Sequence, residues 1–578
     1  MNYINYKDKK TKDTVLFIKK ILSDLGIKTE EDYIANKRIG VSSVCIKIKD
    51  TEIGSNGKGI NKISCLASGY AEFMERLQLR CLMQGTSLLS SLFTYSDRKF
   101  IEHTEIKDSI VFLSFKNKEN IEKFMKNSGG SKKVETIPFY SFKDNDVCYL
   151  PINLVMFLQG SNGMAAGNTF EEAIVQGLSE VCERFSMKQI LQNQIRIPTI
   201  SEDSYKNYSK LDNIISAFEK EGYKVTVKDA SLNKGLPVVC TIFEDIRYPQ
   251  NGLTFRFGCH PCLPIAIERT LTEVLQGKNI EDKHWRITQR YMKIPDDCSV
   301  DNLFVSATRK GCYVNSTNKI ISCLISQDGY DYEYNNKANA WINDEIVDNK
   351  QLVTKLLTTI RNFSQNIYIR NCSFLNFPTV YILIPEMSTM YDSFINDADK
   401  YSDIYNWFIN KTIINSENIT NLLETCEFLT QRLYIETRLT DIPAEYIGLL
   451  CSIILNNENK INLFLDMIIR KTQRNINSTK DQEFFLCLKY YFNQKFKNIP
   501  IPQIYMQMEK IYDNDLIEEI KYFVNNITFK NVKLLLSKFK QEKKRSELPD
   551  NLKQLKKVLN KQYKRNCPNQ TILSKYRL

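Results

Sequence analysis

A chain of 578 residues is too long for one compact core, and its 43% hydrophobic and 25% charged residues form an ordinary globular composition, which argues against disorder. The net charge of +12 is concentrated in residues 531–578, where fourteen Lys or Arg stand against three acids. Sixteen scattered cysteines, a polar N-terminus and no apolar stretch near the ~18 residues of a spanning helix predict a cytoplasmic protein with reduced thiols, no secretory signal and no membrane segment.

The first part of the chain alternates helices with short strands. Residues 1–40 are predicted to be mostly helical and to lead into a strand at Val44–Ile48. A glycine-containing turn at Ser55–Gly59 then opens a long amphipathic stretch from Ile63 to about Met83. Short β-like runs follow between residues 98 and 160, including SIVFLSF and VCYLPINLVMF.

A second glycine-rich turn at Gly160–Asn168 opens a second long helix that runs to about Leu191. The strands VTVKDA, LPVVCTIF and LTFRFGCH lead to a third helix from about Pro264 to Gly277, and a last β-like run covers Val380–Pro385. After about residue 400, apolar residues recur at three- and four-residue spacing, which predicts an all-helical region of several hairpins without a strict period.

The basic segment that begins at about residue 531 has two interpretations. Lysine-rich helices are most often solvated faces, whereas a basic tail can also contact RNA or a ribosome. The sequence favours the solvated face and leaves contact with nucleic acid as the weaker alternative.

One pattern of residues occurs twice in the chain. Ser55–Gly57 (SNG) precedes Glu72–Arg76 (EFMER), and Ser161–Gly163 (SNG) precedes Glu180–Arg184 (EVCER). Residues i, i+3 and i+4 lie on one helix face, so each copy gathers two glutamates and an arginine into one polar stripe. The repetition predicts two related halves that face one site.

Further polar residues extend these stripes. Ser68 shares the face of the first helix, and Glu172 and Gln176 share that of the second. In the third helix, Arg269, Glu273 and Gln276 lie together. A single E-x-x-E-R motif is usually a surface ion-pair ladder. Here, two copies each follow an SNG segment in the sequence, and a third helix has a similar polar face, which favours a shared cavity.

Such a cavity needs cations. Two carboxylates ~4 Å apart repel by about 4 kcal/mol at an effective dielectric near 20. Magnesium suits carboxylates together with phosphate oxygens, and arginines can clamp a phosphate bidentately. Lys58, in the GKG segment, is well placed to meet a phosphate. The residues therefore predict a Mg²⁺–nucleotide site, although no G-x-x-x-x-G-K-[ST] motif is present.

These motifs resemble those of the YcaO family. The resemblance rests on Ser68–Arg76 (S-x-x-x-E-x-x-E-R), on Ser161–Arg184, which contains GNT-x-x-EA, and on Glu268–Gly277 (ERTLTEVLQG), and it extends from about residue 5 to residue 400. Motifs of this length in this order are highly specific.

The resemblance implies roles for individual residues. Magnesium would be held by Glu72, Glu180, Glu183 and Glu273. Nucleotide contacts would come from Lys7, Thr14, Glu75, Asn168, Glu172, Arg184 and Arg269. Ala165 stands where family members use a serine contact, so that hydrogen bond is in doubt. No catalytic residue is assigned.

The resemblance also implies chemistry and partners. Family members use ATP to activate a peptide amide oxygen, and azoline-forming members end in a proline-rich P-x-P-x-P tail. This chain ends in NQTILSKYRL and carries a long helical region instead. It resembles the branch that serves as accessory factor for β-methylthiolation of an aspartate in a small-subunit ribosomal protein. That branch implies a homodimer with two partners, a radical methylthiotransferase and the ribosomal protein.

Other sites are less well supported. Cys259 and Cys262 lack the second pair that a structural zinc site needs. Only three histidines are present, which disfavours a Ser-His-Asp triad or a His-ligated metal. The chain also lacks the C-x-x-x-C-x-x-C motif of a cluster-binding radical enzyme.

The predicted architecture has two parts. Residues 1–400 would form an α/β (α+β) YcaO-type ATP- and magnesium-binding domain, and residues 401–578 an all-α, tetratricopeptide-like domain that includes the basic tail. The predicted function is that of the ATP-using accessory factor. The alternatives are a cyclodehydratase or thioamide-forming enzyme that acts on a ribosomal peptide, and a scaffold whose binding of a partner is switched by the nucleotide.

Overall fold

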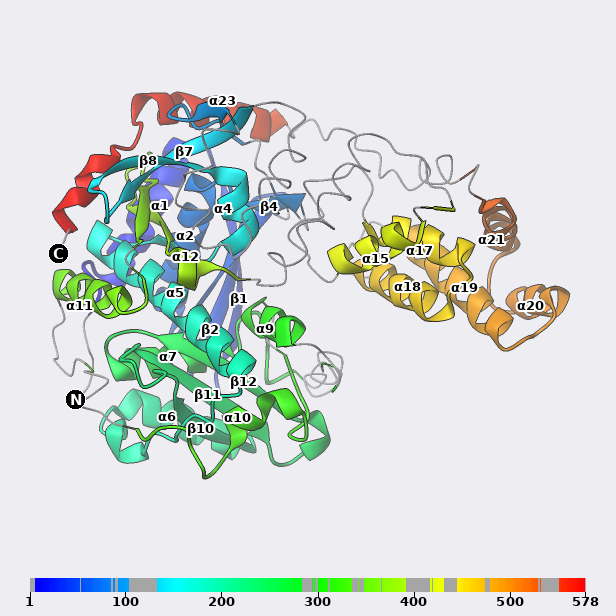
Figure 1. The fold of residues 1–578 in the computed structure, drawn as a ribbon, viewed down its shortest axis with the longest axis horizontal. Helices are drawn as coiled ribbons and strands as arrows, with labels where there is room; N and C mark the ends of the chain where they lie inside the picture. Colours follow the sequence, from blue (N-terminus) through cyan, green and yellow to red (C-terminus); the bar gives the residue numbers. More distant parts are fainter. Residues whose placement is uncertain are drawn as a thin grey trace. The chain divides into compact units, whose positions relative to one another are not determined.

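The computed structural model describes residues 6–102, 133–282, 300–309, 312–334, 348–390, 419–430, 444–472, 479–528 and 550–576, apart from isolated gaps, and a few single residues between them. The chain forms two compact units (Figure 1). The first contains the described residues up to 390 together with 550–576, and the second contains those from 419 to 528. The predicted run SIVFLSF and residues 532–549 of the basic tail lie outside the described residues.

The first sheet of the first unit is antiparallel with the order β1-β2-β3-β4-β5. Its strands are β1 (Thr29–Asn36), β2 (Val41–Ile48), β3 (Ile53–Gly59), β4 (Met83–Gln84) and β5 (Ser87–Leu88). Helix α2 (Lys62–Gln78) packs on β2 and β3, and α1 (Thr11–Asp24) packs on α2. Two expectations are corrected here, because β1 lies within the region predicted to be helical and α2 ends before Met83.

The predicted turn at Ser55–Gly59 is also corrected, since these residues belong to strand β3. Its glycines serve packing. A Cβ atom on Gly57 would lie 2.3 Å from the backbone nitrogen of Gly69 in α2, so only glycine lets this helix approach the strand so closely. In the second copy, Gly163 has a φ of 81° and its carbonyl oxygen lies near Gly177 of the following helix. The glycine of each SNG segment thus lies close to a glycine of the helix that follows it in the motif.

Two further sheets complete the first unit. One has the order β6-β7-β13-β14-β9, with β8 paired to β7, and the other has the order β10-β11-β12. Their strands are β6 (Lys99–Glu102), β7 (Lys133–Ser141), β8 (Asp146–Pro151), β9 (Met164–Ala166), β10 (Tyr223–Asp229), β11 (Val238–Asp245), β12 (Leu253–Cys259), β13 (Tyr368–Asn371) and β14 (Thr379–Leu383). The strands predicted within residues 225–260 are confirmed. In the run VCYLPINLVMF, β8 is followed by helix α4 (Ile152–Gln159).

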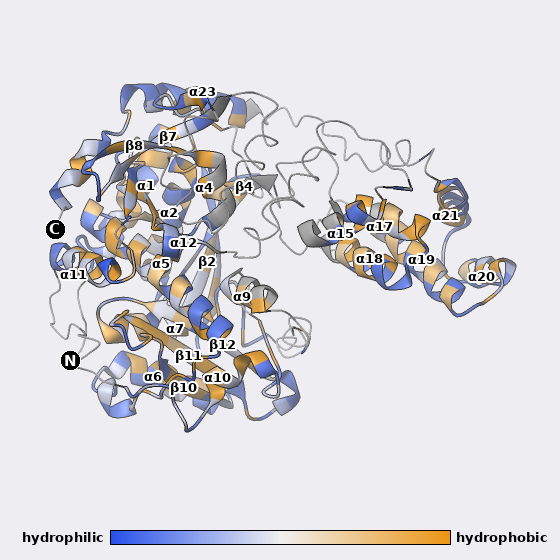
Figure 2. Cartoon of the chain, in the orientation of Figure 1, coloured by the Kyte–Doolittle hydropathy of each residue, from blue (hydrophilic) through white to orange (hydrophobic). Residues whose placement is uncertain are grey.

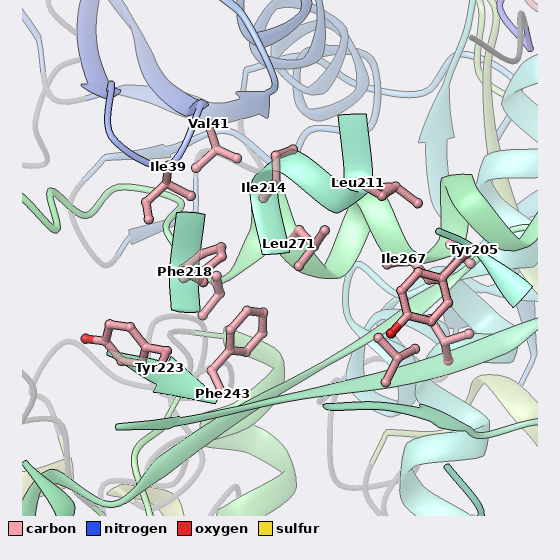
Figure 3. Packing of buried hydrophobic residues seen from close by; sticks show 14 of the residues in the cluster. Ile39, Val41, Tyr205, Leu211, Ile214, Phe218, Tyr223, Phe243, Ile267 and Leu271 are labelled. Atoms are coloured by element: carbon pink, nitrogen blue, oxygen red, sulfur yellow. The ribbon is translucent and has the colours of Figure 1, made fainter. Parts of the chain in front are cut away.

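Helix α5 (Phe170–Asn193) is the central element of this unit. It packs on β9 and β14 of one sheet and on β12 of the other. Helices α6 (Ser209–Lys220) and α7 (Leu263–Glu273) pack on the three-stranded sheet. Their interface is a core that includes Leu211, Phe218, Phe243 and Leu271 (Figure 3). Because α5 contacts two sheets, side chains along its length can meet groups from both.

Strand β12 is buried at every residue, and β11 at all but one. Strands covered on both faces have near-continuous apolar sequences, and Figure 2 accordingly shows α7 and the neighbouring strands as largely hydrophobic. The one charged residue within β12 is Arg256, whose side chain is buried.

The remaining helices of the first unit lie around these sheets. They include α9 (Val300–Arg309), α10 (Ser322–Ile325), α11 (Asn349–Arg361), α12 (Pro385–Ser388), α23 (Asp550–Arg565) and the 3₁₀ helix η6 (Gln570–Tyr576). The return of α23 and η6 corrects the predicted division at residue 400, which placed residues 401–578 in one domain. The reason is long-range packing, since Tyr563 stacks on Phe93 and donates a hydrogen bond to Asp97.

The second unit is helical throughout its described residues. It contains α15 (Ile419–Thr430), α17 (Ala444–Ile454), α18 (Glu458–Thr472), α19 (Thr479–Phe496), α20 (Ile501–Met508) and α21 (Asn514–Asn526). Consecutive described helices pack on one another from α15 to α20, and α21 packs on α19. Gly448 lies directly against the ring of Phe464, where a Cβ atom would be only 2.3 Å from a ring carbon. Across the described parts of both units, no helix has the length and apolar character needed to cross a membrane.

Candidate functional site

The predicted carboxylates come from three helices, and Lys58 interacts electrostatically with carboxylates of all three. Strand β3 holds Lys58, whose ammonium forms an ion pair with Glu273 at the end of α7. The charges of Glu183 in α5 and Glu72 in α2 also act on Lys58. Burial nevertheless lowers the pKa of Lys58 to about 8, against the effect of these carboxylates. The structure therefore brings Lys58, Glu72, Glu183 and Glu273 into one electrostatic cluster.

On α2, Arg76 lies between the two glutamates of its motif. Its Nη2 is 3.7 Å from Glu72 Oε1 and its Nε is 3.4 Å from Glu75 Oε1. Burial raises the pKa of Glu72 and raises that of Glu75 well above its usual range, and the negative charge of Glu180 on α5 adds to both shifts. The two E-x-x-E-R motifs thus face each other closely enough for their charges to interact.

On α5, the two glutamates of the motif differ in their partners. Arg184 Nη2 lies 3.1 Å from Glu180 Oε1. Glu183 makes no hydrogen bond or ion pair with any residue that the structure describes, and burial raises its pKa to about 7 although Arg184 and Lys58 act in the opposite direction. A half-buried carboxylate without a direct partner is suited to bind a cation.

The four predicted metal ligands do not form a ready-made cage. Within the described residues, no group of three or more Asp, Glu, His or Cys side chains could hold a metal ion. Glu72, Glu180 and Glu273 are instead paired with Arg76, Arg184 and Lys58. Magnesium is commonly bound through one or two carboxylates, phosphate oxygens and water, so this donor set fits Mg²⁺ that arrives with a nucleotide.

The predicted contacts near the N-terminus form a second cluster at the start of α5. Lys7 Nζ lies 2.8 Å from Glu172 Oε1, and the Asp8 N–H donates to Glu172 Oε2 at 3.2 Å. Asn168 Nδ2 donates to Glu172 at 2.9 Å, and Thr14 Oγ1 donates to Asn168 Oδ1 at 2.7 Å. Burial alone would raise the pKa of Glu172, but Lys7 and these donors together lower it. Lys7, Thr14, Asn168 and Glu172 are therefore brought together.

Arg269 is held by neutral groups. Its Nη1 donates to the Cys259 carbonyl at 2.7 Å and its Nη2 to Gln176 Oε1 at 2.6 Å. The sequence placed Gln176 on the polar face of α5 but gave it no role, and the structure shows it orienting Arg269. Because no carboxylate pairs with Arg269 among the described residues, its charge is available to an anion.

Ala165 differs from the other predicted contacts. It lies in β9 opposite Val380 of β14 and is completely buried. Its methyl group cannot donate a hydrogen bond, which agrees with the doubt raised by the sequence. Tyr6 and His260 were not predicted, yet their rings meet edge to face 5.2 Å apart, and the positive charges of Arg269 and Lys7 act on His260.

Arg256 was also not predicted. It is buried in β12, and its charge acts on both Lys58 and Lys278. The available sequence signal was a lone arginine in the otherwise apolar run LTFRFGC.

Comparisons with known proteins identify the family of the chain. The family model for the YcaO cyclodehydratase, described as ATP- and Mg²⁺-binding, matches residues 56–388. The chain is 34% identical over 300 residues to the ribosomal protein S12 methylthiotransferase accessory factor YcaO of Escherichia coli K12, which is 48% of this chain and 50% of that protein. It is 28% identical over 407 residues to an uncharacterized protein of Haemophilus influenzae, which is 67% of this chain and 66% of that one. The chain thus spans half to two thirds of these relatives' length.

Among solved structures, the chain is similar to a heterocyclase in complex with substrate and cofactor. Its TM-score is 0.49 at 20% identity, and the match covers 68% of this chain and 56% of the heterocyclase. Another is YcaO from Methanopyrus kandleri bound with AMPPCP and Mg²⁺, with a TM-score of 0.43 at 16% identity and coverage of 69% and 97%.

Proposed function

Since the chain belongs to the YcaO family, whose members bind ATP and Mg²⁺, we propose that it is an ATP-using accessory factor for β-methylthiolation of an aspartate in a small-subunit ribosomal protein. The function of its 34% identical relative in Escherichia coli supports this role. The observation on which the proposal chiefly rests is the position of Lys58, which joins carboxylates of α2, α5 and α7. Its partners would be the radical methylthiotransferase and the ribosomal protein.

In this proposal, the chain's own residues divide the nucleotide site into two regions. Glu72, Glu180, Glu183 and Glu273 would hold Mg²⁺. Lys7, Thr14, Asn168 and Glu172 would contact the nucleotide near the start of α5, and Glu75, Arg184, Arg269 and Lys58 would contact it near the metal. Bound Mg²⁺–ATP would supply an activated phosphoryl group. Arginine and lysine charges would offset the negative charge that develops on its oxygens.

The site assignment can be tested by binding. Glu180→Gln removes the carboxylate that Arg184 holds, and we expect Mg²⁺-dependent ATP affinity to fall much more than the melting temperature of the free protein. The matched control is Glu458→Gln on the exposed surface of α18. An equal loss of melting temperature with and without nucleotide would count against the assignment.

The biological role can be tested by intact mass. The decoding-centre ribosomal protein should lose all or part of its methylthio increment when the gene for this chain is deleted. An unchanged mass would contradict the accessory role.

A second candidate is an enzyme that activates amide oxygens of a ribosomal peptide and forms azolines or thioamides. The word cyclodehydratase in the family description favours it. Multiple turnovers of ATP with a peptide substrate would support it, and would also exclude a scaffold that only switches partners with nucleotide.

We also propose a role for the second unit. Packing of consecutive helices from α15 to α20 is compatible with a tetratricopeptide-like arrangement that mediates dimerisation or docking. The cysteines among the described residues are all free thiols, which supports a cytoplasmic location.

A further inference from the structure

Arg256 is a buried cation that makes no ion pair with a carboxylate among the residues that the structure describes. Only 5% of its surface is exposed, and it is the only charged residue in its strand. Its Nη1 donates to the carbonyl oxygens of Phe255 at 3.0 Å and Ala307 at 3.4 Å. Both acceptors are neutral. A buried guanidinium that lacks an ionic partner is costly, so it calls for an explanation beyond packing.

The unused part of this side chain has a defined shape. Among the residues that the structure describes, the buried Arg256 Nε has no hydrogen-bond partner, and Nη2 makes no hydrogen bond either. These two nitrogens form one edge of the guanidinium, the edge that binds two oxygens of a carboxylate or phosphate at once. Two residues earlier on the same face of β12, the Thr254 hydroxyl is also buried and has no hydrogen-bond partner within the described ranges.

The surroundings of Arg256 belong to the metal end of the site. Glu183 is the carboxylate whose charge acts on Arg256, and it has no hydrogen-bond partner among the described residues. Lys58, which is paired with Glu273, and Lys278 near the end of α7 are the nearby cations. Among the described residues, Cys312 and Tyr313 also act on Arg256.

The distance along α5 decides which part of a nucleotide could reach this edge. Glu172, which Lys7 and Asn168 hold, precedes Glu183 by eleven residues, or about 16 Å at 1.5 Å per residue. An extended nucleotide that contacts both clusters would have its metal-bound phosphates near Glu183. Its outermost phosphoryl group would then be the part closest to Arg256.

We propose that Arg256 binds the terminal phosphoryl oxyanion at the metal end of the site through its Nε–Nη2 edge. This inference rests on the proposed ATP-binding function and adds a specificity residue to it. A carboxylate ligand fits less well, because Glu183 and Glu273 would repel it. A phosphoryl group shares Mg²⁺ with those same glutamates, and the cation removes the repulsion.

The test compares Mg²⁺–ATP with Mg²⁺–ADP by isothermal titration calorimetry. Wild-type protein should bind ATP more tightly than ADP. In Arg256→Met, ATP affinity should fall about 10- to 100-fold while ADP affinity stays within twofold, as expected for loss of hydrogen bonds to a charged group. The matched control is Arg196→Met, which replaces an exposed arginine that pairs with Asp331 and should change neither the ATP affinity nor the ADP affinity.

Two additional measurements keep the test decisive. Arg256→Lys retains the buried charge but loses the two-pronged edge, so a folded protein with intermediate ATP affinity is expected if Arg256→Met does not fold. Inorganic phosphate added to the Mg²⁺–ADP complex separates the sources. Binding by wild type and not by the variants would identify a site that also accepts free phosphate, whereas binding of ATP alone would identify a site for the attached phosphoryl group.

The results that would overturn the proposal are distinct from those that would overturn the function. If folded variants lose ATP and ADP affinity by the same factor, or lose neither, Arg256 does not read the terminal phosphoryl group. If wild-type protein binds neither nucleotide, the proposed function itself fails.

Discussion

Lys58 on β3 and Glu273 on α7 form an ion pair at the point where the carboxylates of three helices meet. Lys58 thus occupies the position of a cation among groups that are otherwise predicted to bind Mg²⁺. Without metal it offsets part of the repulsion between the glutamates. With metal, the two cations compete for the same oxygens.

This competition leads to the first prediction. Lys58→Met should lower the melting temperature of the free protein by several degrees, because removal of one partner of a partly buried pair costs roughly 1–3 kcal/mol. Mg²⁺ should then raise the melting temperature more in the variant than in wild type. Lys49→Met, on the exposed turn after β2, is the control. Equal Mg²⁺ responses in the two proteins would show that Lys58 does not share ligands with the metal.

The second prediction concerns pH. Burial raises the pKa of Glu183 to about 7 from an ordinary value of 4.5, so the folded protein binds a proton that the unfolded chain has lost. The stability contributed by this group is complete below pH 4.5 and is lost as pH rises to 7. The melting temperature of the ligand-free protein should therefore fall between pH 4.5 and 7, because Glu183 loses its proton in this range.

Mg²⁺–ATP should have the opposite dependence. Binding to the ionised carboxylate should tighten as pH rises through 7 and should release protons, which calorimetry in buffers of different ionisation enthalpy can count. Glu183→Gln should flatten the pH dependence of the free protein and reduce proton release. A variant with the wild-type pH profile would assign that titration to another group.

The third prediction concerns the return of the chain to the first unit. Tyr563 shares a buried network with Asp97 and Arg370, in which Arg370 Nη2 donates to the Tyr563 hydroxyl at 2.8 Å and to Asp97 Oδ2 at 2.9 Å. Tyr563→Phe should destabilise the protein by about 1–3 kcal/mol, since it removes a hydrogen bond from the buried Arg370 and from the half-buried Asp97. Urea unfolding would measure this, with Lys561→Met on the exposed face of α23 as a control of small effect. Equal effects would indicate that α23 is not held by this network.

The fourth prediction compares two glycines, one needed for close packing and the other only for its backbone conformation. Gly57→Ala would place a Cβ atom 2.3 Å from Gly69 N and 2.4 Å from Cys65 O, so α2 would have to move off β3. We expect a loss of several kcal/mol and a parallel loss of nucleotide binding, because α2 holds Glu72 and Glu75. Gly26→Ala meets no atom within 4 Å and should cost only about 1 kcal/mol through its φ of 74°. A mild effect of Gly57→Ala in the same thermal-melting assay would refute the close packing.

The sequence predicted the parts of the site that depend on local spacing. The E-x-x-E-R stripes could be placed on helices because a period of 3.6 residues is visible in any short segment. The strands around residues 225–260 were equally clear from their β-branched and aromatic runs. By contrast, the glycines at Ser55–Gly59 suggested a turn. They instead let helix α2 pack closely on strand β3, and the local sequence does not show that a helix will pack there.

Contacts between distant segments were the part that could not be predicted. Helix α23 has the same apolar spacing as the helices of the second unit, and only the contacts of Tyr563 with Phe93 and Arg370 show where it packs. Arg256 is similar. Its sequence neighbours predict its strand, but they do not show that Glu183 of α5, Lys58 of β3 and Lys278 beyond α7 will lie near it.

The course of the chain makes the second unit an insertion, since the segments on both sides of it belong to the first unit. A single proteolytic cut between residues 397 and 549 would therefore leave two fragments, each with a part anchored in the first unit. The fragments should co-purify after nicking and separate only when the Asp97–Arg370–Tyr563 network is unfolded. An appendage joined at one end would be released by the same cut.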